Sequence, residues 1–207
     1  MLKTRWAKAL AFAACLAPIF LLAWRAYTQH LTANPIEFIT RFTGTWTLRF
    51  VVFTLAVTPL RKLLGMPDLI RFRRMIGLFA FFYGTLHLIT YIWLDKFFDT
   101  GEIWRDVLKR PFITAGFTAF VLMLPLAATS TAGWIRRMGG KRWQLLHRLV
   151  YVTGIAGVIH YYWLVKSDIR EPAFYGALVG VLLLYRAAVA IRNRKPKPAV
   201  KRAAATS

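Results

Sequence analysis

The feature that most constrains this chain is a series of long apolar runs, separated by short segments that hold most of its charged residues. A helix of roughly 20 apolar residues crosses the hydrocarbon core of a bilayer, which is about 30 Å thick. Run length and periodicity predict six helices, over residues 9–24, 46–60, 75–94, 112–130, 143–165 and 174–191. The sequence therefore predicts an all-α fold, an integral membrane helical bundle with six transmembrane helices.

Composition supports this fold class. Hydrophobic residues make up 57% of the 207 residues, whereas soluble domains average about 45–50%. Lys and Arg number 29 against 8 Asp and Glu, for a net charge of +21. In a soluble protein such a charge would indicate nucleic-acid binding, but here the charges cluster between apolar runs. We therefore exclude a nucleic-acid-binding protein and a soluble α/β enzyme.

The positive charges are distributed unevenly between the two predicted sides of the membrane. Twenty Lys and Arg and a single acid, Asp68, fall on the side that holds the termini, and nine Lys and Arg with seven acids fall on the other. Because Lys and Arg are retained in the cytoplasm, both termini are expected there. We divide the chain into a transmembrane domain, residues 1–191, and a basic tail, residues 192–207. We expect the tail to be disordered and to lie against anionic lipid headgroups.

Several redox architectures are excluded by what the chain lacks. The single cysteine, Cys15, excludes an internal disulfide, a C-x-x-C pair, a cysteine-ligated iron–sulfur cluster and a c-type haem attachment. The sequence has neither a G-x-G-x-x-G nor a P-loop spacing, and no predicted extramembrane segment exceeds about 20 residues. Redox chemistry in this chain would need a noncovalent cofactor and an external source of electrons.

Three of the four histidines lie inside predicted spans, where ionisable side chains are costly and are usually functional. His87 lies about 12 residues into the third span and His160 about 17 into the fifth, while His30 falls in a loop. The two spans are parallel, so both histidines are expected in the outer half of the membrane at one level. Two facing imidazoles meet the requirement for bis-histidine ligation of a haem iron. The alternative is that each histidine hydrogen-bonds a neighbouring helix as a packing contact.

The third membrane histidine, His147, begins the fifth span about 20 Å below His160, on the cytoplasmic side. A glycine precedes His87 and His160 by three residues, in GTLH and GVIH, and would leave room for a flat macrocycle or for close helix packing. Aligning these two segments places Arg74 opposite His147, where a two-haem arrangement would need a histidine. His147 could ligate a second haem with a substituted or missing ligand, bind a propionate, or line a flavin or quinone site.

Three segments carry a resemblance to a known family: FTGTWTLRFVVFTLAVTPLR (42–61), RFRRMIGLFAFFYGTLHLITY (71–91) and KRWQLLHRLVYVTGIAGVIHYYWLVK (141–166). The chain resembles, over nearly its whole length, the haem-binding membrane subunits of bacterial periplasmic methionine sulfoxide reductase systems, the MsrQ (YedZ) family. That family is part of the ferric-reductase-like transmembrane superfamily. The most specific feature is the H-x12-H spacing of His147 and His160, with one histidine on the third span.

The resemblance implies an electron-transfer subunit in the bacterial inner membrane. It implies one or two b-type haems, held by His87, His147 and His160, with Arg74 at the position of a fourth histidine. It also implies an FMN, for which no residue of the sequence indicates a binding site. Electrons would enter from a cytosolic flavin reductase or the quinone pool. They would leave to a periplasmic molybdopterin catalytic subunit of the MsrP type, which performs the sulfoxide reduction that repairs oxidised proteins.

Two other functions compete with this one. A self-contained transmembrane metalloreductase of the same superfamily, or another cytochrome b subunit, would share the histidines, but the metalloreductase would need a nucleotide-binding domain that the chain lacks. A transporter or scaffold would explain the spans without any histidine pair, and a transporter is expected to show broken helices or inverted repeats.

Overall fold

The computed structural model describes residues 2–165 and 167–194. Within them all regular secondary structure is helical, which confirms the all-α prediction for the described part of the chain. The elements are α1 (Leu2–Tyr27), α2 (Pro35–Leu63), the 3-10 helix η1 (Pro67–Phe72), α3 (Arg73–Thr90), the π-helix η2 (Tyr91–Asp95), α4 (Thr100–Lys109), α5 (Pro111–Ala128), α6 (Ala132–Met138), α7 (Gly140–Leu146), α8 (Leu149–Leu164) and α9 (Arg170–Arg194).

Four segments are long and apolar enough to cross a membrane: Arg5–Tyr27, Pro67–Asp95, Pro111–Ala128 and Arg170–Asn193. They coincide with the first, third, fourth and sixth predicted spans. The second predicted span lies within α2, which at 29 residues is much longer than expected. The fifth was predicted as one helix over 143–165, and this is wrong at its start. The chain turns at His147 and Arg148, so α7 and the 16-residue α8 are separate helices.

The end of the last helix bears on the predicted tail. Residues 192–194 were assigned to the disordered tail, but α9 continues through them to Arg194. The remainder of the predicted tail, residues 195–207, lies outside the described residues.

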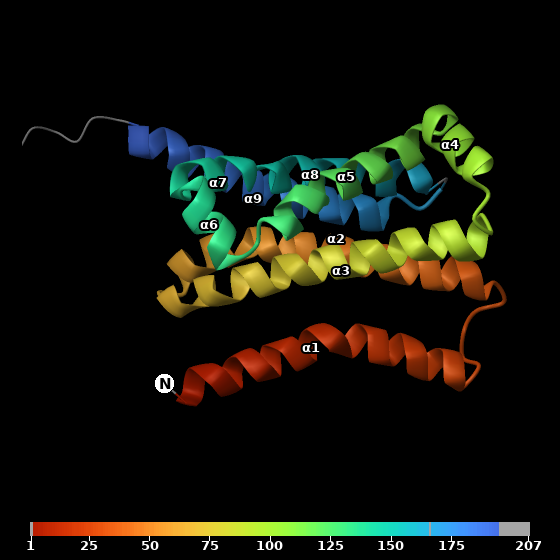
Figure 1. Ribbon diagram of the computed structural model, residues 1–207, viewed down its shortest axis with the longest axis horizontal. Helices are drawn as coiled ribbons and strands as arrows, with labels where there is room; N and C mark the ends of the chain where they lie inside the picture. The colour runs from red at the N-terminus through yellow and green to blue at the C-terminus, as the bar shows by residue number, and fades with distance from the viewer. Residues whose placement is uncertain (1, 166, 195–207) are drawn as a thin grey trace, which may run out of the picture.

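The long helices run along one common direction and alternate in sense (Figure 1). The most extensive contacts join α2 to α3 and α5 to α8, and α9 packs on α8 and α2. Helices α3 and α8 run in the same sense, as expected for the third and fifth predicted spans. Helix α1 lies at the edge of the bundle and packs mainly against α3.

Aromatic rings fill the core between α2 and α3. Tyr83 and Leu55 are fully buried, and the ring of Phe50 stacks on Tyr83 and Phe79, with centroids 5.1 Å and 5.8 Å apart. Such offset aromatic pairs contribute about 0.5–1.5 kcal/mol beyond the apolar area they bury. This core fixes the face that α3 turns towards α2.

The hydroxyl of Tyr83 also ties α1 to the bundle. It accepts a hydrogen bond from the backbone N–H of Ile19 at 3.1 Å and donates one to the carbonyl of Cys15 at 3.0 Å. These two backbone groups are four residues apart and would pair with each other in an uninterrupted helix. The Tyr83 hydroxyl therefore contacts both groups of this pair, next to Pro18, whose missing N–H removes one bond of the helix.

Candidate functional site

His87 on α3 and His160 on α8 face each other in the structure. Their ring centroids lie 6.0 Å apart, and the ring planes make an angle of 69°. Both side chains are half-buried, and each lies in the last third of its helix. The structure thus brings together the two histidines that the sequence placed at one level on parallel helices.

The Nδ1 atom of each imidazole is hydrogen-bonded to a backbone carbonyl of a neighbouring helix. His87 Nδ1 lies 2.9 Å from the carbonyl oxygen of Thr40 on α2, and His160 Nδ1 lies 2.6 Å from that of Phe112 on α5. A carbonyl oxygen can only accept, so Nδ1 carries the proton in both rings. Nε2 is then the unprotonated nitrogen. A carbonyl on the other ring nitrogen is the usual way of orienting a metal-binding histidine and raising its basicity.

Two glycines on neighbouring helices make room for these rings. A Cβ at Gly44 on α2 would lie 3.0 Å from His87 Cε1, and a Cβ at Gly116 on α5 would lie 2.7 Å from His160 Nδ1. Both distances are shorter than ordinary carbon contacts, so the imidazoles occupy the space of the missing side chains. Each histidine is therefore positioned by a second helix, through one carbonyl and one glycine.

The glycines of the GTLH and GVIH patterns face side chains of neighbouring helices. A Cβ at Gly84 would meet Met123 and Thr47, and a Cβ at Gly157 would meet Leu48 at 3.5 Å. Gly84 thus permits close packing of α3 on its neighbours, as in the packing alternative for the GTLH pattern, whereas a Cβ at Gly157 would make only an ordinary contact.

The pair fits a haem iron better than a bare metal ion. Within the described residues no group of three or more His, Cys, Asp or Glu side chains could hold a metal, whereas a haem iron needs only two protein ligands. The unprotonated Nε2 atoms of the two facing rings, whose centroids lie 6.0 Å apart, are the atoms that would hold such an iron. The buried hydroxyl of Thr40, beside His87, also lacks a partner in this part of the chain and is available to a polar group of a cofactor.

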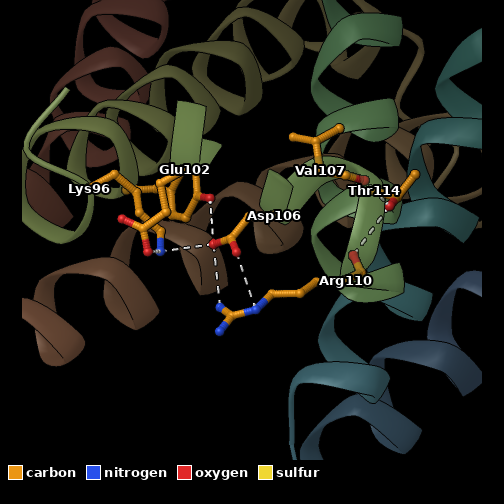
Figure 2. Close-up of polar contacts among 7 residues, drawn as sticks. Lys96, Glu102, Asp106, Val107, Arg110 and Thr114 are labelled. Carbon is orange, nitrogen blue, oxygen red and sulfur yellow. Dashed lines mark hydrogen bonds and ion pairs between the residues drawn. The ribbon is translucent and has the colours of Figure 1, made fainter. Parts of the chain in front are cut away.

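A charged network lies where α4 meets α5, close to the carbonyl that holds His160. Figure 2 shows Lys96, Glu102, Asp106 and Arg110 turned towards one another. Lys96 Nζ lies 2.8 Å from Glu102 and 2.9 Å from Asp106, and Asp106 also pairs with Arg110 at 3.3 Å. The Tyr91 hydroxyl donates to the same carboxylate at 3.0 Å. The network fixes Arg110, which precedes α5 and lies two residues before Phe112.

The ionisation of this network follows from its contacts. The hydrogen bond to Glu102, together with the one to Asp106, raises the pKa of Lys96 above its ordinary value against the opposing effect of burial. Burial alone would raise the pKa of Asp106, but hydrogen bonds from Lys96 and Tyr91 and the nearby positive charges outweigh it. The pKa of Asp106 therefore lies below its ordinary value, and the buried pair is ionised near neutral pH.

His147 belongs to a separate group of residues between α5 and α7. Its Nε2 lies 3.0 Å from the hydroxyl of Thr129, and its ring stacks on Trp143 with centroids 3.8 Å apart. The indole N–H of Trp143 donates to the Thr129 carbonyl at 2.9 Å. Arg74, expected opposite His147, lies close enough for its charge to act on that imidazole, and it also lines a cavity between α3 and α1. The structure does not gather His147 with His87 and His160.

Sequence reasoning missed four contributors to the pair: the carbonyls of Thr40 and Phe112, and the glycines Gly44 and Gly116. A backbone carbonyl leaves no trace in residue identity. Small residues at a helix contact are a usable signal, but the GTLH and GVIH patterns point only to glycines on the same helix as each histidine.

Comparison with known proteins identifies the family of this chain. A family model described as "Ferric reductase like transmembrane component" matches residues 43–158, which include His87 and His147 and end two residues before His160. Three relatives carry the name "Protein-methionine-sulfoxide reductase heme-binding subunit MsrQ". They come from Herminiimonas arsenicoxydans (54% identity, 93% of this chain and 89% of the relative), Caulobacter vibrioides (52%, 86% and 84%) and Ralstonia nicotianae (55%, 81% and 78%). No solved structure matches the chain.

Proposed function

Because the chain belongs to the ferric reductase-like transmembrane family, and within it to the haem-binding MsrQ subunits, we propose that it carries electrons across a membrane to a methionine sulfoxide reductase. The observation that supports this best is the facing pair of His87 and His160, each with Nδ1 bound to a carbonyl. In this proposal the catalytic sulfoxide reduction takes place on the partner subunit.

A b-type haem is the group that His87 and His160 would hold through Nε2, and it supplies one-electron chemistry when bound. The residues of this chain set the position and basicity of those nitrogens. Thr40 and Phe112 orient the rings through their carbonyls, and Gly44 and Gly116 let α2 and α5 approach them. The aromatic and aliphatic core around Tyr83 excludes water from the contact between α2 and α3.

The proposal includes six spans with both termini in the cytoplasm and a location in the bacterial inner membrane. Four spans are supported by length and composition, and α2 and α8 run beside them in alternating sense (Figure 1). The 16 residues of α8 extend about 24 Å, which is less than the average hydrocarbon core of a bilayer.

Alkaline phosphatase fusions test this orientation. A fusion after Phe98 should be active, and fusions after Gly65 or Gly139 should be inactive. The reverse pattern would contradict this orientation.

Electrons would enter at the cytoplasmic end, where His147 and Arg74 lie. We propose an FMN there, reduced by a cytosolic flavin reductase or the quinone pool. The support is the position of His147, which lies beside Trp143 and Thr129 and apart from the histidine pair. Electrons would leave at the opposite end to a periplasmic molybdopterin catalytic subunit of the MsrP type.

The test of the haem assignment uses the purified protein and its single-histidine variants. The wild-type protein and His30→Ala, a matched control in a loop, should show a low-spin b-type absorption spectrum. His87→Ala and His160→Ala should each lose it. A full low-spin spectrum in both variants would refute the pairing, and colourless wild-type protein would favour a transporter or scaffold.

A further inference from the structure

A cavity of about 620 Å³ opens between α1 and the beginning of α3. One part of its lining is cationic: Lys8 comes from α1, Arg71 from η1 and Arg74 from α3. Because α1 and α3 run in the same sense (Figure 1), these three residues meet at one end of the bundle. The rest of the lining is apolar and includes Phe12, Leu78 and Phe79.

The positive charges of this cavity are only partly compensated within the described residues. Arg71 pairs with Asp68 at 3.1 Å, with both side chains more than half exposed, and such surface pairs contribute little. Lys8 and Arg74 form no ion pair in that part of the chain. Three cations around one opening repel one another, and an anion placed between them removes that repulsion. Phosphate oxygens are a suitable partner for the two guanidinium groups.

The apolar part of the lining determines what else the ligand must contain. Both walls, α1 and the η1–α3 segment, belong to candidate membrane spans, and the cavity is open along one side. A small phosphate ion would leave the exposed surfaces of Phe12, Leu78 and Phe82 uncovered. A molecule with a phosphate at one end and an acyl chain at the other would cover both parts.

We propose that this cavity is a binding site for an anionic phospholipid, with its phosphate at Lys8, Arg71 and Arg74 and an acyl chain along the apolar wall. The lipid joins α1 to α3 where direct packing is sparse, since α1 contacts the bundle mainly through α3 and the Tyr83 hydroxyl. The site does not depend on the histidine pair. Only its assignment to the cytoplasmic leaflet rests on the proposed orientation.

Native mass spectrometry of the full-length protein in detergent tests this site. The probe is dioctanoyl phosphatidylglycerol, compared with dioctanoyl phosphatidylcholine, inorganic phosphate and FMN. One phosphatidylglycerol should bind per polypeptide, and phosphatidylcholine and inorganic phosphate should not saturate. Each cation near a membrane surface contributes about 1 kcal/mol, so the double variant Arg71→Gln/Arg74→Gln should bind roughly 30-fold more weakly. Lys62→Gln, an exposed cation at the end of α2 outside the cavity, is the matched control and should bind as wild type.

A second variant fills the apolar part and leaves the charges in place. Leu78→Trp should prevent lipid binding, whereas Leu184→Trp, on the exposed face of α9, should not. Phosphatidylglycerol should raise the Tm of the wild-type and control proteins only, which separates lost binding from lost folding. Equal binding of the two lipids, an unaffected double variant, or stoichiometric displacement of phosphatidylglycerol by FMN would each overturn the proposal. The absorption spectrum, recorded on the same samples, reports separately on the proposed function.

Discussion

Replacement of Gly116 by alanine tests whether α5 positions His160. The new Cβ would lie 2.7 Å from His160 Nδ1 and 2.9 Å from Cε1, whereas ordinary contacts begin at 3.4 Å. The shortfall, about 0.7 Å, has to come from the imidazole or from separation of α5 and α8. Because Nδ1 is fixed 2.6 Å from the Phe112 carbonyl, either movement stretches this hydrogen bond. The perturbation therefore acts on the orientation of the ring as well as on packing.

The magnitude can be bounded by a matched glycine. Overpacking of this kind costs about 1–3 kcal/mol, while alanine in a helix gains roughly 0.5–1 kcal/mol over glycine. At Gly180 on α9 a Cβ would meet nothing within 4 Å, so Gly180→Ala reports the helix-propensity gain alone. The difference between the two variants is then the packing cost. For a chain of this size it corresponds to about 2–4 °C in Tm for each kcal/mol.

Two measurements on the detergent-solubilised protein check this prediction. Gly116→Ala should unfold at a lower temperature than Gly180→Ala. It should also change the low-spin electron paramagnetic resonance signal, which depends on the relative orientation of the two imidazole planes. If the two variants share the same Tm and the same signal, Gly116 does not hold His160 in place and the contact has no functional meaning.

Three further predictions concern other parts of the molecule. Tyr83→Phe removes the hydroxyl inserted into α1 and should lower stability by about 1–3 kcal/mol, measured as a lower Tm; an unchanged Tm would show that α1 closes its own ladder. Asp106 has a lowered pKa in the folded state, so its contribution to stability is present above the unfolded value of about 3.9 and is lost as pH falls through the folded value. Asp106→Asn should flatten the fall in Tm between about pH 5 and about pH 3, and an unchanged slope would assign the acid sensitivity to other groups. His147→Ala should slow haem reduction by the cytoplasmic donor while dithionite still reduces a low-spin haem, and complete loss of haem would make His147 a ligand of the principal iron.

The pairing of His87 and His160 was predictable because it depends only on helix direction and depth. Counting residues from the start of two parallel spans gives the level of each side chain, and the structure brings both rings to one place. Counting does not give the rotation of a helix about its axis. For this reason the sequence could not show that Gly84 faces Met123, or that Gly44 and Gly116 face the histidines.

Counting Lys and Arg to predict membrane orientation also has a physical limit, because the count assigns every arginine near the end of a span to a loop. Arg49 lies in the middle of α2, where its Nε donates to the Tyr175 hydroxyl at 2.8 Å and its guanidinium lies over the Trp46 ring. Arg186 donates to the carbonyl of Leu55 at 2.7 Å. That carbonyl lacks its usual partner because Pro59, four residues on, has no N–H. Only contacts between distant helices reveal that these two guanidinium groups donate hydrogen bonds inside the bundle.

The hydrogen bonds of the ring nitrogens separate His147 from the other two membrane histidines. Thr129 donates its single hydroxyl proton to the carbonyl of Pro125 at 2.6 Å, so it must accept from His147, and Nε2 of His147 carries a proton. In His87 and His160 the proton is on Nδ1, and Nε2 has the free lone pair. A second iron at His147 would therefore require loss of the Thr129 contact or use of the opposite nitrogen. The aligned position, Arg74, offers no ordinary iron ligand. This arrangement supports the proposal of one haem in each chain, with His147 at the proposed point of electron entry.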